Sequence, residues 1–320
     1  MIVKSECIIM PIYRQNYPRL NPVERSMNMS IFEGSAVALV TPFTSYGINY
    51  PALDRLLDYQ LENGTDAIVV CGTTGEPATM TPEEKHEVMR YAVDYVAGRV
   101  PVILGTGGNN TSAVIQESQY AESVGADALL VVTPFYNKCS QEGLYRHYME
   151  VADSVDTPII VYNVPSRTGV NVLPKTFERM AAHENIAAIK EACGNISQIV
   201  ETARLVRGKM DIYSGNDDQV IPIMSLGGKG VISVTANIAP AMIHEMTMLY
   251  LAGRHEEAAD MQLDLNPLNN IMFSDVNPIP VKTALNLMGF EAGPLRMPLC
   301  EMSQAGNDEL IKVLESYSLI

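Results

Sequence analysis

Short runs of consecutive apolar residues recur along the chain from residue 34 onward. A loop rich in Gly, Thr, Pro or Asn follows each run and leads into a segment with apolar residues at helical spacing. The eight runs predict strands at 36–41, 66–71, 101–106, 127–133, 158–163, 186–190, 211–215 and 230–235. Because the apolar residues are consecutive rather than alternating, we expect parallel strands that are buried on both faces.

The segments between the strands carry clear helix signals. Residues 50–64 have leucines at helical spacing, with Pro51 near the start and Gly64 just past the end. The sequence TPEE at 81–84 predicts a capping box at the start of another helix. After residue 238 the strand signals stop, and four segments are predicted to be helical: 239–253, 255–273, 278–289 and 307–319.

Eight alternating strand–helix units fit either a closed barrel or a doubly wound open sheet, and their number and even spacing favour the barrel. An open sheet would be expected to carry a dinucleotide-binding fingerprint. The sequence GTGGNN at 105–110 lacks the last glycine of GxGxxG, and no GxxxxGK[ST] pattern occurs. We therefore expect an α/β fold, namely an eight-stranded parallel (TIM) β/α barrel at 31–238 with a small all-helical C-terminal domain at 239–320. Residues 1–30 show no periodicity and are predicted to form a loose N-terminal extension, with Met27 or Met29 as an alternative start.

The composition excludes several classes of function. The 320 residues carry a formal net charge of −15, which argues against nucleic acid and anionic membranes as partners because phosphate binding requires clustered Lys and Arg. No apolar run approaches the roughly 18 residues that span a bilayer. The five cysteines are scattered and the five histidines form no ligand pattern, so we expect no metal site. Free thiols in a reducing cytoplasm are the simplest interpretation of the cysteines.

In a parallel barrel the chemistry collects at the carboxyl ends of the strands. Residues with hydroxyl groups dominate these ends, and the one lysine among them is Lys190, which ends the strand at 186–190. Partial burial at the mouth of the barrel lowers the pKa of a lysine, and the neutral amine attacks carbonyl groups to form a Schiff base. The alternative is that Lys190 only pairs with Glu191 or another carboxylate at the rim.

Three further features favour the Schiff-base hypothesis. Tyr162 ends the neighbouring strand, and adjacent strands lie about 5 Å apart, so its phenol is expected to reach the amine of Lys190. The turn GTTGE at 72–76 offers two hydroxyls and several backbone amides to a carboxylate. Arg167 can hold a carboxylate with two hydrogen bonds. Each feature alone has an ordinary explanation, as an interfacial tyrosine, a glycine turn and a surface arginine. Together they indicate a Schiff-base enzyme that acts on small oxo-acids.

Six motifs stand out along the chain: GTTGE at 72–76, PFYN at 134–137, YNVPSRTG at 162–169, IKEA at 189–192, GVISVTAN at 230–237 and NPIPVK at 277–282. Together they closely resemble the motifs of the 4-hydroxy-tetrahydrodipicolinate synthase family, also called dihydrodipicolinate synthase. The likeness runs from about residue 31 to the C-terminus. It implies a lyase of the class I aldolase type that condenses pyruvate with L-aspartate 4-semialdehyde on the diaminopimelate route to lysine.

The resemblance also implies the catalytic residues. Lys190 would form the Schiff base with pyruvate, and Tyr162 would shuttle protons. Thr73 would link Tyr162 to Tyr136, which members of the family supply across a tight dimer interface. The family is usually a homotetramer of two such dimers, and its resting enzyme requires neither a metal nor an organic cofactor.

The substrate-binding residues implied by the resemblance lie in three of the motifs. Thr74 and the backbone from Gly72 to Gly75 would bind the carboxylate of pyruvate. Arg167 would bind the carboxylate of the semialdehyde, and the backbone carbonyl of Ile232 would line the site.

Two alternatives were weighed against this function. A sister enzyme such as N-acetylneuraminate lyase or a 2-keto-3-deoxy-sugar-acid aldolase would typically carry Ser-Thr at positions 73–74 and would lack arginine at position 167. The chain has Thr73-Thr74 and Arg167, which fit the synthase. The second alternative is a non-catalytic relative that binds an oxo-acid, but no member of the expected catalytic set is missing.

The resemblance finally bears on regulation. Relatives that L-lysine inhibits carry histidine where this chain has Lys85, glutamate where it has Ala113 and tyrosine where it has Phe135. Loss of the glutamate removes a partner for the ammonium group of the inhibitor, and Lys85 adds a like charge. We therefore expect weak or absent inhibition by L-lysine.

Overall fold

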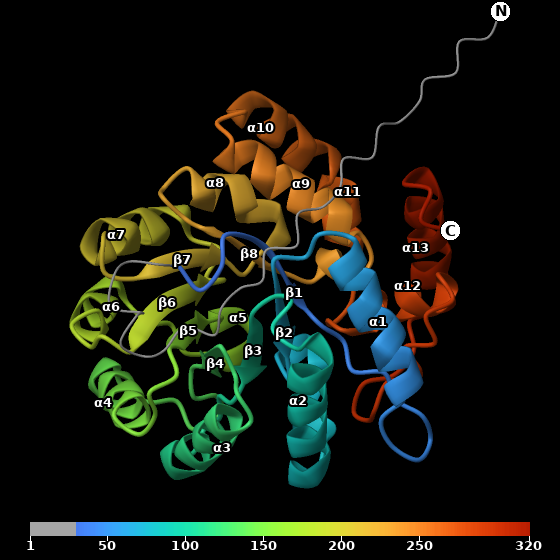
Figure 1. Ribbon diagram of the computed structural model, residues 1–320. Helices are drawn as coiled ribbons and strands as arrows, with labels where there is room; N and C mark the ends of the chain where they lie inside the picture. Colours follow the sequence, from blue (N-terminus) through green and yellow to red (C-terminus); the bar gives the residue numbers. More distant parts are fainter. Residues whose placement is uncertain (1–29) are drawn as a thin grey trace, which may run out of the picture.

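The computed structural model describes residues 30–320 and contains a closed ring of eight parallel strands with helices on its outside (Figure 1). Each strand pairs with the next, and β8 pairs with β1. The expected barrel is therefore confirmed. Residues 1–29 lie outside the described part of the chain, and with them the predictions about the extension and the start at Met27 or Met29. The strands are β1 (Gly34–Ala38), β2 (Ala67–Val70), β3 (Val102–Gly105), β4 (Ala128–Val132), β5 (Ile159–Asn163), β6 (Ile186–Glu191), β7 (Asp211–Ser214) and β8 (Gly230–Ser233).

The first strand ends at Ala38, three residues before the predicted end. The backbone N–H of Leu39 still donates to Val69 (2.9 Å), but the N–H of Val40 donates to the side-chain oxygen of Asn237 (3.0 Å). The Asn237 amide in turn donates to the carbonyl of Ala38 (2.8 Å). The Asn237 side chain, which follows β8, thus takes the place of a neighbouring strand as the hydrogen-bond partner at this end of β1. The strand therefore ends before the apolar run does.

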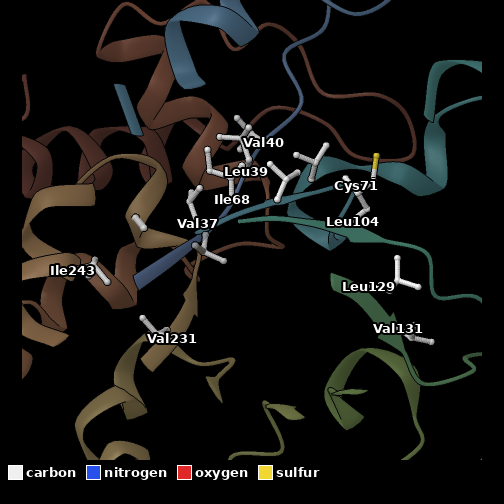
Figure 2. Close-up of a cluster of buried hydrophobic side chains, with 14 of the residues drawn as sticks. Val37, Leu39, Val40, Ile68, Cys71, Leu104, Leu129, Val131, Val231 and Ile243 are labelled. Carbon is white, nitrogen blue, oxygen red and sulfur yellow. The ribbon is translucent and has the colours of Figure 1, made fainter. Parts of the chain in front are cut away.

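Side chains alternate along each strand between two buried clusters, one inside the barrel and one beneath the helices. On β1, Ala36 and Ala38 belong to the inner cluster, whereas Val37 belongs to the outer one. Figure 2 shows part of the outer cluster, with labelled side chains from β1, β3, β4 and β8 among others. The prediction that the strands are buried on both faces is confirmed.

The helices that cover the outer cluster begin where the sequence signals indicate. Helix α1 is capped by Asn49, and α2 has the full capping box, because the Thr81 hydroxyl accepts from the N–H of Glu84 and the Glu84 carboxylate accepts from the N–H of Thr81. Short 3₁₀ turns follow β2, β7 and β8, and two of them carry site residues. The helices up to β8 are α1 (Tyr50–Glu62), α2 (Pro82–Val96), α3 (Thr111–Ser123), α4 (Gln141–Ala152), α5 (Pro165–Thr168), α6 (Pro174–Met180), α7 (Ile196–Val206) and α8 (Val220–Met224).

The segment after residue 238 is helical, as expected. Helix α9 (Pro240–Leu251) packs against β1 and β8 beside the barrel. The single helix predicted at 255–273 is wrong, because the structure has two helices there, α10 (His255–Asp264) and α11 (Asn266–Ile271). Pro267 lies in the first turn of α11, and a proline inside a continuous helix would lack the N–H that the ladder needs. Helices α12 (Ile279–Leu287) and α13 (Gln304–Ser316) complete the chain. Within residues 30–320 no helix has the length and apolar character needed to cross a membrane.

Two aromatic rings fill the amino-terminal end of the barrel. Phe32, which precedes β1, stacks on Tyr213 of β7 with 4.2 Å between ring centroids. The Tyr213 hydroxyl donates to the carbonyl of Phe32 (2.8 Å). Both side chains are buried, so this end is packed, and the carboxyl ends of the strands remain for chemistry.

Replacing Asn237 by alanine tests the seam between β8 and β1. We expect Asn237→Ala to lower the free energy of unfolding by about 2–4 kcal/mol, because each buried backbone group left without a partner costs roughly 1–3 kcal/mol. Denaturant unfolding of wild type and variant measures the change. Asn266→Ala, at an exposed position of α11, is the control and should shift the value by less than about 0.5 kcal/mol. Equal effects of the two substitutions would contradict the assignment.

Candidate active site

Lys190 and Tyr162 stand side by side at the carboxyl end of the barrel. Strands β5 and β6 are in parallel register with Tyr162 opposite Lys190, and the Lys190 Nζ lies 4.4 Å from the centre of the Tyr162 ring. Lys190 is two residues after Ala188, which belongs to the inner cluster, so its side chain also points into the barrel. The predicted proximity of the amine and the phenol is confirmed.

Burial dominates the electrostatics of Lys190. The residue is 5% exposed, and desolvation lowers the pKa of its amine to about 7, an effect that the nearby charge of Arg167 strengthens and that of Asp217 opposes. A substantial fraction of the amine is therefore neutral and nucleophilic near pH 7.

Glu191 is not the partner of Lys190. Its side chain points to the other face of β6, where its carboxylate accepts from the Asn163 amide (3.0 Å) and from the backbone N–H of Cys193 (2.8 Å). Within residues 30–320 Lys190 forms no ion pair with any carboxylate. The alternative in which the lysine serves only in a rim salt bridge therefore does not describe this structure.

Tyr162 is placed to exchange protons with groups around Lys190. Burial raises the pKa of its phenol to about 12, and both Arg167 and a side-chain hydrogen bond with Thr73 act in the opposite direction. The phenol is therefore protonated at neutral pH and able to donate a proton. The Thr73 hydroxyl is the group with which it would exchange that proton. The part of Thr73 in proton transfer stays a prediction from the resemblance.

The turn after β2 presents backbone and hydroxyl groups beside this pair. Residues Thr73–Gly75 form a 3₁₀ turn closed by the hydrogen bond from the N–H of Gly75 to the carbonyl of Gly72 (2.9 Å). The Thr74 hydroxyl accepts from the Asn277 amide (3.0 Å), which orients it. A Cβ on Gly75 would lie 3.1 Å from the Thr41 hydroxyl, so the close approach of the backbone favours glycine at this position.

Arg167 and Ile232 lie on elements of the barrel, and their roles in binding substrate stay predictions. Arg167 lies on the short helix α5 after β5, and its guanidinium donates to the backbone carbonyl of Asn277 (3.4 Å). Ile232 is a fully buried residue of β8 whose side chain belongs to the same inner cluster as Tyr162. Arg167 thus supplies a cation near the opening, as a carboxylate site requires.

Tyr136 is the one expected catalytic residue that a single chain does not bring to the site. Its side chain is 90% exposed, and its backbone has a left-handed conformation with φ of 66°, which is uncommon for a tyrosine. Bonds from the Asn137 amide to Asn109 (2.9 Å) and from the Asn109 amide to Phe135 (3.2 Å) hold the turn. The structure therefore leaves Tyr136 exposed to solvent in the single chain.

Two residues near the site were missed by the sequence analysis. Asp217 is buried in the 3₁₀ turn after β7 and accepts hydrogen bonds from the Ser233 hydroxyl and from the N–H of Val234 (2.9 Å). Asp217 directly follows the residues at the end of β7, and this position in the sequence could have identified it as a candidate. Asn277 lies inside the NPIPVK motif, but its contact with Thr74 spans 203 positions. No group of three or more His, Cys, Asp or Glu in the described chain has the arrangement of a metal site.

A closed β/α barrel with a desolvated lysine and a protonated tyrosine at the carboxyl ends of adjacent strands defines the class of Schiff-base lyases related to class I aldolases. A sequence profile described as the dihydrodipicolinate synthetase family matches residues 31–317. The chain belongs to this family.

Similar proteins support the same assignment. The chain is 57% identical over 293 residues to the 4-hydroxy-tetrahydrodipicolinate synthase of Thermoanaerobacter sp. (strain X514), covering 91% of this chain and 99% of the relative. It is 53% identical to 4-hydroxy-tetrahydrodipicolinate synthase 1 of Clostridium acetobutylicum, covering 91% and 100%. The crystal structure of dihydrodipicolinate synthase from Thermotoga maritima superimposes with a TM-score of 0.89 at 43% identity, covering 91% and 100%. The family and these relatives favour the synthase over the sister aldolases and the non-catalytic relative.

The low pKa of Lys190 predicts a distinctive reactivity with pH. Competitive acylation across pH 5–10, read by mass spectrometry of peptides, should show half-maximal reactivity of Lys190 near pH 7, because the neutral amine that reacts accumulates as the pH rises through the pKa. Asp217→Asn removes a charge that raises this pKa and should move the midpoint to lower pH. Asp218→Asn, at the exposed neighbouring position, is the control. A midpoint near the usual lysine value of about 10.4 would contradict the assignment.

Proposed function

We propose that the protein condenses pyruvate with L-aspartate 4-semialdehyde through a Schiff base on Lys190. The observation that carries the proposal is the buried amine of Lys190 beside the phenol of Tyr162. The family to which the chain belongs and the identity to relatives named 4-hydroxy-tetrahydrodipicolinate synthase support the same reaction. On this proposal the protein acts in the diaminopimelate route to lysine, in the cytoplasm.

The first half of the reaction uses the neutral amine. The Lys190 nitrogen attacks the keto carbon of pyruvate, and the carbinolamine loses water to become an imine. Tyr162 supplies and removes the protons of these steps, with the Thr73 hydroxyl as its relay. Loss of a methyl proton then converts the imine into an enamine, whose carbon is the nucleophile of the second half. Every covalent step takes place on the lysine, so the reaction as proposed requires neither a metal nor an organic cofactor.

The second half joins the two substrates and releases the enzyme. The enamine carbon attacks the aldehyde carbon of the semialdehyde, and the aldehyde oxygen becomes the hydroxyl of the product. The amino group of the semialdehyde then displaces Lys190 from the imine carbon and closes the ring, which regenerates the free amine. Both substrates therefore remain attached to one lysine until the ring has formed.

Both substrates carry a carboxylate, and we propose a separate binding group for each. We assign the pyruvate carboxylate to Thr74 and the backbone amides between Gly72 and Gly75. The semialdehyde carboxylate is assigned to Arg167, and the carbonyl of Ile232 is taken to line the pocket. An arrangement of this kind orients each substrate by its carboxylate, so that the reacting carbons meet beside Lys190.

The exposure of Tyr136 supports an oligomer. A tyrosine that is 90% exposed and held in a left-handed turn is free to contact a neighbouring subunit, and the family resemblance implies such a contact. We propose that Tyr136 of the partner subunit completes the proton relay with Thr73 and Tyr162, and that two such dimers form a homotetramer.

Removing the amine tests the proposed mechanism. Lys190→Ala should lower kcat/KM by at least about 10³-fold, the order of effect seen when a covalent nucleophile is lost. A coupled assay with pyruvate and the semialdehyde measures the rate. Borohydride reduction with pyruvate should add a mass to Lys190 of the wild type and none to the variant.

Lys175→Ala is the matched control, because Lys175 is an exposed lysine on α6 outside the site, and it should retain wild-type activity and adduct formation. Wild-type activity that survives Lys190→Ala nearly intact would rule out the mechanism.

The structure changes the physical reason for which we expect insensitivity to L-lysine. Lys85 forms an ion pair with Glu117 (2.9 Å), so its charge is compensated and the argument from like-charge repulsion is weakened. The loss of a carboxylate at Ala113, an exposed position on α3, and of a hydroxyl at Phe135 remain. These two losses leave an effector ammonium and carboxylate without the partners that inhibited relatives provide.

We accordingly expect added L-lysine to leave the rate of the purified protein nearly unchanged in the same coupled assay. The triple variant Lys85→His, Ala113→Glu and Phe135→Tyr restores the residues of inhibited relatives and should acquire inhibition. Strong inhibition of the wild type by modest L-lysine would show that the inference is wrong.

A further inference from the structure

A fully buried ion pair, used by none of the proposed reaction steps, lies behind the turn that follows β2. The Lys282 ammonium on α12 is 2.8 Å from the Glu76 carboxylate, and each side chain is 1% exposed. The two residues are 206 positions apart in the sequence. The pair therefore joins the barrel to the C-terminal helices.

The backbone of Glu76 closes the anion-binding turn. Glu76 directly follows Gly75, and its N–H donates to the carbonyl of Thr73 (3.1 Å). Its backbone is left-handed, with φ of 55° and ψ of 39°. For a residue other than glycine this conformation costs on the order of 1 kcal/mol and persists where the surroundings fix it. The contacts of the Glu76 side chain therefore hold the turn in this conformation.

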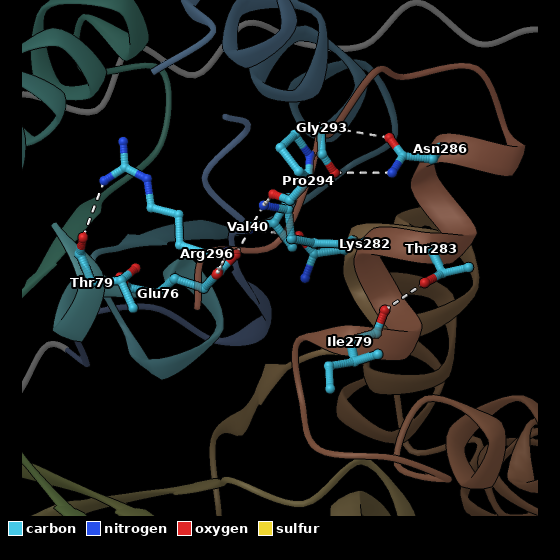
Figure 3. Close-up of polar contacts among 11 residues, drawn as sticks. Val40, Glu76, Thr79, Ile279, Lys282, Thr283, Asn286, Gly293, Pro294 and Arg296 are labelled. Carbon is cyan, nitrogen blue, oxygen red and sulfur yellow. Dashed lines mark hydrogen bonds and ion pairs between the residues drawn. The ribbon is translucent and has the colours of Figure 1, made fainter. Parts of the chain in front are cut away.

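Residues of the C-terminal segment bind the Glu76 side chain and its partner Lys282 (Figure 3). The second oxygen of Glu76 accepts from the backbone N–H of Arg296 (3.1 Å). Lys282 donates also to the carbonyl of Pro294 (2.8 Å). Both cations lie over the ring of Phe43, Lys282 at 4.5 Å and Arg296 at 4.0 Å from its centre. The carboxylate and the ammonium therefore have two polar partners each, in keeping with the rule that buried charges are paired and hydrogen-bonded.

A bond from the same C-terminal segment reaches the turn itself. Asn277 is the first residue of the sequence NPIP, which leads into α12. Its side-chain amide donates to the Thr74 hydroxyl (3.0 Å) and orients it. The Arg296 guanidinium donates to the carbonyl of Thr79 (3.1 Å) in the 3₁₀ turn that follows Glu76. The segment 72–79 is consequently held from both ends by residues after 276.

Stability alone is a poor explanation for such a pair. Replacing a buried ion pair by apolar residues of similar volume is often neutral or stabilising, whereas removing one partner leaves an uncompensated charge. A buried pair fixes geometry more effectively than an apolar contact does, because its hydrogen bonds are directional.

We propose that the Glu76–Lys282 pair is a positioning device that sets the geometry of the Gly72–Gly75 turn and thereby the affinity for the keto-acid carboxylate. The inference rests on the proposed function, in which this turn binds pyruvate. It makes Glu76 and Lys282 positioning residues for pyruvate binding. Arg167 contacts the C-terminal segment at Asn277 and not at this pair.

The double variant Glu76→Gln with Lys282→Met tests the inference, because it removes both charges while nearly conserving volume. Each single variant should lower the thermal unfolding midpoint, and the double variant should recover most of that loss because no unpaired charge remains. The KM for pyruvate should nevertheless stay raised by about tenfold in the double variant, the effect of losing roughly one hydrogen bond. The KM for the semialdehyde should change less than about twofold, since Arg167 is held by the backbone carbonyl of Asn277 and contacts neither Glu76 nor Lys282.

Glu76→Asp provides a second variant that keeps the charge. Its side chain is one methylene shorter, so the pair re-forms only if the turn shifts, and the same selective rise in the pyruvate KM is expected. The exposed pair Lys175–Glu178, replaced as Lys175→Met with Glu178→Gln, is the control and should leave both KM values unchanged.

The outcomes separate the inference from the proposed function. A wild type that forms no borohydride-trapped adduct with pyruvate would remove the proposed function and the inference with it. A wild type that forms the adduct, together with double and Asp variants whose pyruvate KM stays within about twofold of the wild type, would overturn the inference alone. Equal increases in the KM of both substrates would also overturn it, because a general distortion of the site would then explain the result.

Discussion

The chemistry of this protein depends on keeping one amine out of water. Lys190 projects from β6 into a closed barrel whose other end is packed by Phe32 and Tyr213, so solvent reaches it only from the carboxyl ends of the strands. Desolvation is the principal cause of the lowered pKa, and it exists because the ring of strands is closed. An open sheet would expose the same lysine on one side and leave it charged. Closure of the barrel is therefore a condition of the reactivity as well as of the fold.

A comparison of two buried lysines shows what selects a nucleophile. Lys190 and Lys282 both lie over an aromatic ring, at 4.4 Å and 4.5 Å, and burial lowers the pKa of both. They differ in their partners, because Lys282 has a carboxylate at 2.8 Å, whereas the closest acidic influence on Lys190 is the more remote charge of Asp217. The contact with Glu76 opposes the lowering of the Lys282 pKa by burial. Within residues 30–320 Lys190 has no such contact, and its pKa falls to about 7.

The parts of the molecule that the sequence predicts are those set by local pattern. Consecutive apolar residues mark all eight strands to within a few residues, and the capping box marks the start of α2. Lys190 and Tyr162 were found together because the register of neighbouring strands follows from their order. Asp217, Asn277 and the partner of Glu76 were not found, because each contact joins residues from 16 to 206 positions apart. Their placement depends on how loops and α12 pack on the barrel mouth, and no short-range signal carries that information.

The barrel strands and the C-terminal helices have different structural roles, because a strand does not restrain the loop that follows it. A strand can aim a side chain such as Lys190 with precision, but the loops beyond it are free to move unless something restrains them. On the proposed function the turn at Gly72–Gly75 presents backbone amides to an anion. It ends in a left-handed glutamate, a conformation that is unfavourable for residues other than glycine. A carboxylate locked to a cation on α12 restrains the turn in a way that backbone hydrogen bonds within three residues do not. The buried charge is thus best understood as the means by which a helical segment more than 200 positions away holds a short loop in the geometry its ligand requires.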